Sequence, residues 1–101
     1  MSVSFEIPET MTVIEIAEFG GPEVLKPAKR PTPTPGAGEL LVKTAAVGIN
    51  FPDTMQRQGA YPPPPNTTDI PGLELAGTVV AVGSGVDGFS PGDSVCGLVS
   101  G

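Results

Sequence analysis

The residues best suited to chemistry lie in one short stretch, residues 48–61, which reads GINFPDTMQRQGAY. Asn50 carries an amide that donates and accepts hydrogen bonds, and Asp53 adds a carboxylate three residues later. Tyr61, the only tyrosine of the chain, adds a phenolic hydroxyl. Donors of this kind can polarise a carbonyl oxygen without a metal ion, so the stretch predicts a hydrogen-bonding site.

Each of these three residues also has a purely structural interpretation. Asn50 can satisfy backbone groups at a turn or as a helix N-cap. Asp53 lies where a first-turn acid interacts with the helix dipole, and this role is the favoured one for it. Tyr61 can pack its ring on the prolines at 62–65. The residue types alone leave both interpretations open.

A second motif, in residues 78–88 (TVVAVGSGVDG), contains the string G-x-G-x-x-G after a strand-like run. In a dinucleotide site such glycines lead into a helix whose N-terminus binds the pyrophosphate. Here residues 89–93 (FSPGD) follow, and this run would stop a helix almost at once. We therefore expect a turn between two strands and not a phosphate site.

Strands and one short helix must position these residues. We expect strands over 11–18, 39–47, 73–82 and 93–99. In the first strand Ile14 and Ile16 alternate with Glu15, which predicts that Glu15 lies on a wet face. A helix of one or two turns should begin at residues 50–53 and end at Gly59. Prolines at 27, 31, 33 and 35 predict an extended surface crossing over 27–38.

Composition narrows the class of protein. The chain has 101 residues with 14 glycines and 13 prolines, and 39% of its residues are hydrophobic, so we expect one loop-rich, mainly β domain. A net charge of −6 argues against nucleic-acid binding. No apolar run approaches a membrane span, and residues 1–10 do not resemble a signal peptide, which predicts a cytoplasmic protein. The chain has no histidine and a single cysteine, which excludes an internal disulfide, a structural Cys/His zinc site and a histidine general base.

Three segments together carry a family resemblance: GINFPDTMQRQGAYPPPP (48–65), PGLELAGTVVAVGSGV (71–86) and SPGDSVCGL (90–98). In this order and spacing they resemble the N-terminal catalytic domain of medium-chain dehydrogenases/reductases. The nearest likeness is to the zinc-free quinone oxidoreductases, the zeta-crystallin-like branch. FGGPEVL (19–25) and PTPGAGELLVK (33–43) fit the same family.

The resemblance implies a GroES-like, partly open β-barrel with short helices. Residues 1–101 would form an incomplete N-terminal part of this catalytic domain. The Rossmann domain, with the main NADPH-binding glycines, would follow Gly101. On this basis we expect residues 1–101 alone to be inactive and to have no measurable affinity for NADPH.

The activity implied is reduction of a quinone or a related α,β-unsaturated carbonyl by NADPH, with no metal, by a homodimeric enzyme. A zinc-free enoyl reductase of the same family and a non-catalytic GroES-like binding module are the alternatives. The choice of quinone or enone, and NADPH against NADH, stays open.

The resemblance also assigns residues. Asn50, Tyr61 and Asp53 would be catalytic. Residues in contact with the cofactor would be Asn50, Phe51, Pro52, Asp53, Thr54, Met55 and Tyr61. Some zinc-free relatives carry a tyrosine at the Met55 position, so its absence removes a second phenol from the cleft. Glu74 has no assignable partner in the sequence, and Cys96 is expected to be a small buried hydrophobe.

Zinc content tests the branch. Zinc alcohol dehydrogenases place a ligand cysteine at the position of Asn50 and a ligand histidine at that of Leu73, and neither replacement supplies a ligand zinc prefers. We predict no stoichiometric zinc in the dialysed gene product that contains residues 1–101, as measured by elemental analysis. A content of about one zinc per chain would contradict this.

Overall fold

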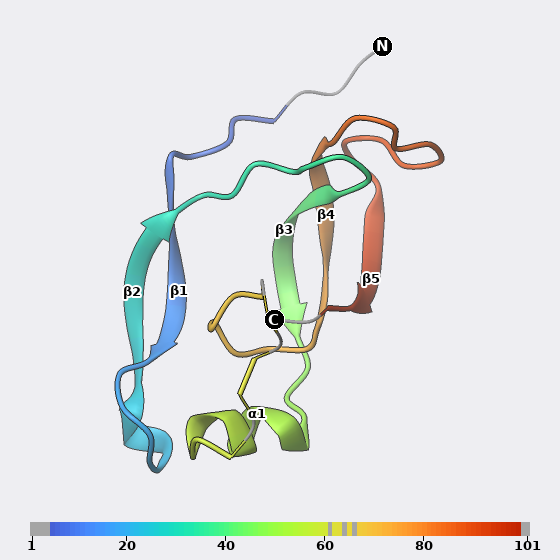
Figure 1. The fold of residues 1–101 in the computed structure, drawn as a ribbon. Helices are drawn as coiled ribbons and strands as arrows, with labels where there is room; N and C mark the ends of the chain where they lie inside the picture. Colours follow the sequence, from blue (N-terminus) through green and yellow to red (C-terminus); the bar gives the residue numbers. More distant parts are fainter. Residues whose placement is uncertain (1–4, 61, 64, 66, 100–101) are drawn as a thin grey trace.

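The computed structural model describes residues 5–60, 62, 63, 65 and 67–99. The elements are β1 (Thr10–Ile16), η1 (Pro22–Val24), β2 (Leu25–Pro31), β3 (Leu40–Val47), α1 (Phe51–Arg57), β4 (Glu74–Val82) and β5 (Ser94–Leu98). β1 and β2 form one antiparallel sheet, and a second antiparallel sheet has the order β3-β4-β5. The two sheets stand beside each other, and α1 lies at one end of the molecule (Figure 1).

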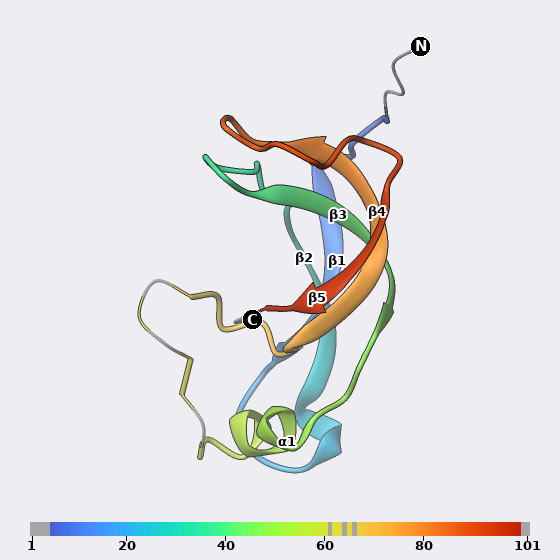
Figure 2. The ribbon, with the colours of Figure 1, turned by 90° about the vertical axis from the view of Figure 1, so that its right-hand side faces the viewer.

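The expected fold class is confirmed. The protein is mainly β, and within the described residues the two sheets stay separate and do not close into a barrel. Figure 2 shows how strongly the three-stranded sheet curves, which gives the assembly the shape of a partly open barrel. The four expected strands correspond to β1, β3, β4 and β5, and the expected helix corresponds to α1.

The expectation for residues 27–38 was partly wrong, because β2 covers residues 25–31. The backbone N–H of Thr32 donates to the carbonyl of Glu9 at 2.9 Å. Because the ladder alternates, the backbone N–H groups of the even-numbered residues of β2 point toward β1, and those of the odd-numbered residues point away from it. Pro27 and Pro31 therefore turn their missing N–H away from β1, where no ladder bond is lost. Only residues 32–39 form the predicted crossing, which connects the two sheets (Figure 1).

The exposed face of β1 is the opposite of the one expected. Ile14 is 46% exposed, whereas Glu15 is part-buried. The Glu15 carboxylate accepts a hydrogen bond from Nε of Arg30 at 2.6 Å, and this partner is what makes burial of the charge tolerable. The period-two alternation was correct, and only the identity of the inner face was wrong.

The glycine string of residues 83–88 is confirmed as part of the connection between β4 and β5, and no helix begins there. Gly83 has a packing role, because its N–H donates to the carbonyl of Glu39 at 2.8 Å. A Cβ at this position would collide with the carbonyl oxygen of Gly36. The first glycine of the motif thus lets the end of β4 approach the crossing segment closely.

Replacement of Gly83 by alanine tests this close approach. The added Cβ meets backbone, which cannot rotate away, so we expect Gly83→Ala to lower the free energy of unfolding by about 1–3 kcal/mol. Gly97→Ala in β5 is the matched control, because a Cβ there meets nothing within 4 Å, and its effect should stay within about 0.5 kcal/mol. Equal unfolding midpoints in urea for the two variants would refute the packing role.

Candidate functional site

The site is built where β3 ends and α1 begins. Asn50 has extended backbone angles, φ −125° and ψ 159°, and is the N-cap of α1. The carboxylate of Asp53 accepts a hydrogen bond from the Asn50 backbone N–H at 2.9 Å, and the Asp53 N–H donates to the Asn50 carbonyl at 3.0 Å. Pro52 lies in the first turn, where its missing N–H costs nothing. The structural roles proposed for Asn50 and Asp53 are therefore both present.

The side chain of Asn50 has a second partner, Glu74, at the start of β4. The Nδ2 atom of Asn50 donates to Oε1 of Glu74 at 3.1 Å. The sheet register explains this contact, because Val47 pairs with Leu75 and the next positions along the two strands are Gly48 and Glu74. A Cβ at Gly48 would occupy the space of the Glu74 carboxylate. The partner of Glu74 that the sequence left unassigned is thus Asn50.

Some hydrogen-bonding capacity at this site remains unused. Asn50 is part-buried, and it retains one side-chain N–H after the contact with Glu74, while its side-chain oxygen faces the backbone of Asp53 in the capping box. Oδ1 of Asp53 is buried and has no partner among the described residues. The start of α1 therefore offers a donor on Asn50 and an acceptor on Asp53, and it can hydrogen-bond a carbonyl or a hydroxyl.

The other predicted contact residues lie along the same helix. Phe51 is 76% exposed, and Pro52, Thr54 and Met55 are part-buried. The hydroxyl of Thr54 donates to the carbonyl of Phe51 at 2.7 Å, so this hydroxyl hydrogen is already used within the helix and is not offered to a ligand. Tyr61 lies outside the described residues.

The expectation that Cys96 is buried was wrong. Its side chain is exposed on β5, because no other described element covers that face of the strand. The pattern of apolar residues around it indicated a strand correctly, but such a pattern does not reveal whether the strand is covered.

Two residues of α1 fix the helix in place and were not singled out in the sequence. Nε of Arg57 donates to the carbonyl of Gly20 at 3.1 Å, and the N–H of Gly20 donates to the carbonyl of Arg57 at 2.9 Å. Gln56 is buried, and its Nε2 donates to the backbone oxygen of Asp69 at 3.0 Å. The burial of Gln56 cannot be seen in the sequence, so no local sequence signal indicated these contacts.

Arg30 connects the β1–β2 sheet to the segment before β4. It pairs with Glu15 at 2.6 Å and with Asp69 at 3.0 Å. The hydrogen bonds to Glu15 and to Asp69 raise the pKa of the Arg30 guanidinium, so it stays charged throughout the accessible range. Asp69 thus joins two elements: its carboxylate pairs with Arg30 of β2, and its backbone oxygen accepts from Gln56 of α1.

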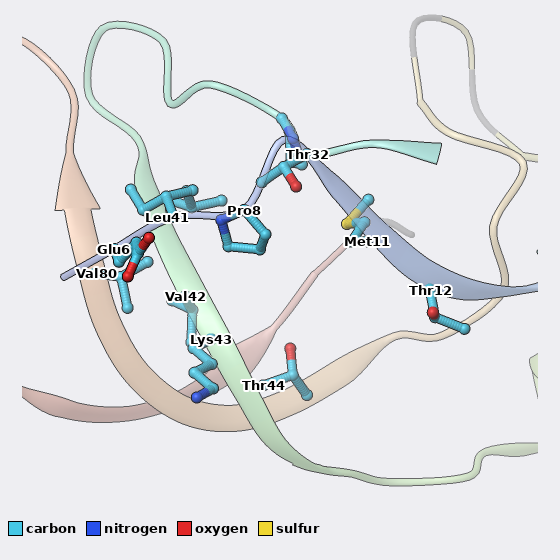
Figure 3. A pocket seen from close by; sticks show the side chains of 12 residues that line it. Glu6, Pro8, Met11, Thr12, Thr32, Leu41, Val42, Lys43, Thr44 and Val80 are labelled. Atoms are coloured by element: carbon cyan, nitrogen blue, oxygen red, sulfur yellow. The ribbon is translucent and has the colours of Figure 1, made fainter. Parts of the chain in front are cut away.

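A separate hollow of about 430 Å³ lies between the two sheets. Figure 3 shows Met11 and Thr32 on the side of β1 and β2, with Leu41, Val42 and Val80 on the side of β3 and β4. Its lining does not include Asn50, Asp53 or Glu74. The hollow is the open interior of the barrel-like assembly, distinct from the site at the start of α1.

An N-capped short helix beside a half-open antiparallel β assembly defines the class as GroES-like. The family model described as "Alcohol dehydrogenase GroES-like domain" matches residues 36–100. The chain belongs to this family, within the medium-chain dehydrogenases/reductases. Similarity to individual proteins, including quinone oxidoreductases and a VAT-1 homolog-like protein, supports the assignment.

The chain is 39% identical over 92 residues to "Synaptic vesicle membrane protein VAT-1 homolog-like" of Mus musculus, covering 91% of the chain and 22% of the relative. It is 45% identical over 84 residues to "Quinone oxidoreductase 1" of Escherichia coli K12, covering 83% and 25%. The crystal structure of Escherichia coli quinone oxidoreductase complexed with NADPH superposes with a TM-score of 0.76 at 44% identity, covering 85% of this chain and 26% of that one. The chain thus spans about a quarter of the length of the curated relatives it matches.

Of the helices in the described residues, none has both the length and the apolar character that crossing a bilayer requires.

The helix cap at Asp53 yields a stability prediction. Asp53→Ala removes the acceptor of the Asn50 N–H, and we expect a loss of about 1 kcal/mol in the free energy of unfolding. Asp53→Asn keeps an oxygen acceptor but loses the charge near the helix N-terminus, which should cost about 0.5 kcal/mol. The measurement is urea unfolding followed by circular dichroism, and an alanine variant as stable as the parent would contradict the role.

Proposed function

We propose that residues 1–101 are the N-terminal catalytic-domain segment of an NADPH-dependent oxidoreductase that reduces quinones or related α,β-unsaturated carbonyls without zinc. The observation that carries the proposal is the Asn50–Glu74 contact at the start of α1. At the positions where zinc alcohol dehydrogenases place cysteine and histidine ligands, this chain has Asn50 and Leu73. The similarity to quinone oxidoreductases supports the same substrate class.

The residues at the site fit part of the environment that a nicotinamide cofactor needs. Asp53 has a buried Oδ1 without a partner in the described residues, which suits the polar groups of a nucleotide. Bound NADPH would supply the hydride. The main contacts of NADPH are proposed to lie beyond Gly101, and the solved Escherichia coli relative complexed with NADPH supports this choice of cofactor.

In this proposal Asn50 holds the substrate oxygen. Its remaining side-chain N–H donates a hydrogen bond to the carbonyl, and this bond strengthens as negative charge develops on the oxygen. The exposed ring of Phe51 lies beside Asn50 in sequence and offers apolar surface to a flat substrate. Asp53 keeps the backbone of Asn50 fixed. Tyr61 is proposed as a further donor, and the cytoplasmic location and homodimeric state stay predictions.

The test uses the gene product that contains residues 1–101. We expect it to oxidise NADPH with at least one member of a panel of ortho-quinones, para-quinones and enones, followed by the loss of NADPH absorbance. Asn50→Ala should lower kcat/KM by about 100-fold, the effect of removing one preorganised donor. Asp87→Asn, an exposed change in the β4–β5 connection, is the control and should leave activity unchanged.

Two results would point elsewhere. Faster turnover of a crotonyl thioester than of any quinone would identify an enoyl reductase instead. No NADPH oxidation with any quinone or enone would refute the proposal and favour a non-catalytic binding module.

A further inference from the structure

The orientation of the Asn50 side chain is fixed by chemistry at Glu74. An ionised carboxylate carries acceptors only, so the amide atom that faces Oε1 of Glu74 at 3.1 Å must be Nδ2, the donor. Oδ1 of Asn50 is thereby turned away from Glu74. Without such a partner the terminal torsion of asparagine is broad and roughly two-fold, so the amide could present either atom to a ligand.

The space for this contact is provided by Gly48. A Cβ at position 48 would meet Oε1, Cδ and Cγ of Glu74, which are atoms of a flexible side chain and not backbone. Any larger residue at 48 would therefore displace the carboxylate from Asn50 without breaking the sheet. The backbone of Asn50 is held separately by Asp53, so Glu74 contributes one specific constraint, the rotation of the amide.

We propose that Glu74 is a positioning residue, whose carboxylate fixes the rotation of the Asn50 amide so that its second N–H is presented to a bound ligand. The effect on catalysis rests on the function proposed above. A donor that is already oriented needs no reorganisation when charge develops on the substrate oxygen.

The kinetic test compares three variants of the gene product that contains residues 1–101. Glu74→Gln can both donate and accept, so it tolerates either rotation of the amide, and we expect kcat for quinone reduction to fall about tenfold while KM for NADPH is unchanged. Gly48→Ala should have the same effect, because its Cβ displaces the carboxylate. Asp87→Asn, in the connection between β4 and β5, is the control that removes the same negative charge, and it should leave kcat unchanged.

An exchanged pair tests the contact between positions 50 and 74 through stability. In Asn50→Asp combined with Glu74→Gln the glutamine can donate to the new carboxylate, so a hydrogen bond is restored with donor and acceptor reversed. Because Asn50→Asp also removes the N–H that is proposed to hold the substrate oxygen, this double variant is read for stability alone. We expect its unfolding midpoint to recover relative to both single variants, and a midpoint below both of them would overturn the contact on which the proposal rests.

A spectroscopic readout tests the contact independently of turnover. In asparagine-labelled protein, the side-chain NH₂ signals of Asn50 are identified by their loss in Asn50→Ala. We expect one of the two protons to be shifted downfield by the carboxylate, and this shift to vanish in Glu74→Gln and in Gly48→Ala. Unchanged signals would overturn the proposal. If the signals change as expected but the parent protein reduces no quinone, the proposed function fails while the contact stands.

Discussion

The antiparallel pairing of β4 with β3 is the interaction on which the rest of this structure depends. The register brings the end of β3 beside the start of β4, so Gly48 stands next to Glu74. Asn50 and Glu74, which are 24 residues apart in sequence, meet because of this pairing. At the opposite end of the β3–β4 pair, Gly83 lets the end of β4 approach residues 32–39, the connection between the two sheets. The pairing of β3 with β4 thus places the candidate site at one end, and at the other end it requires a glycine at position 83.

The apolar core that supports this pairing is small. Val79 on β4 is fully buried, whereas Ile49 and Leu98 are 86% and 83% exposed. Removing a large apolar side chain from water contributes about 1.5–3 kcal/mol. Ile49 and Phe51 flank Asn50 in sequence and are both exposed, so whatever covers the start of α1, ligand or protein, gains this free energy close to the polar groups of the site.

Much of the fold could be predicted because local signals agreed with it. The alternation in β1, the apolar run of β4 and the Asn-x-x-Asp start of α1 each indicate their element, and the residues after the glycine string exclude a helix. What failed depended on partners distant in sequence. Glu15 lies on the inner face, where Arg30 of the neighbouring strand pairs with it, and Cys96 is exposed because no other described element covers its face of β5.

The candidate site was predicted in part for the same reason. Asn50 and Asp53 were found because a helix cap is a local pattern. The partner of Glu74 could not be found, because it depends on the exact register between two strands. A glycine two residues before Asn50 was the available signal, since it leaves room for a side chain from the next strand.

The two prolines of β2 have a consequence for how the smaller sheet can grow. The odd-numbered residues of β2 have their backbone groups on the edge that faces away from β1. Among them Pro27 and Pro31 have no N–H, and the N–H of Leu25 already donates to the carbonyl of Pro22. Of the seven residues of β2, this leaves the backbone N–H of Lys29 as the one donor on that edge, which is too little to start a new ladder. In β1 every residue whose backbone faces away from β2 has an N–H group. The hairpin is therefore directional: it resists edge-to-edge aggregation along β2, and a further strand would add along β1.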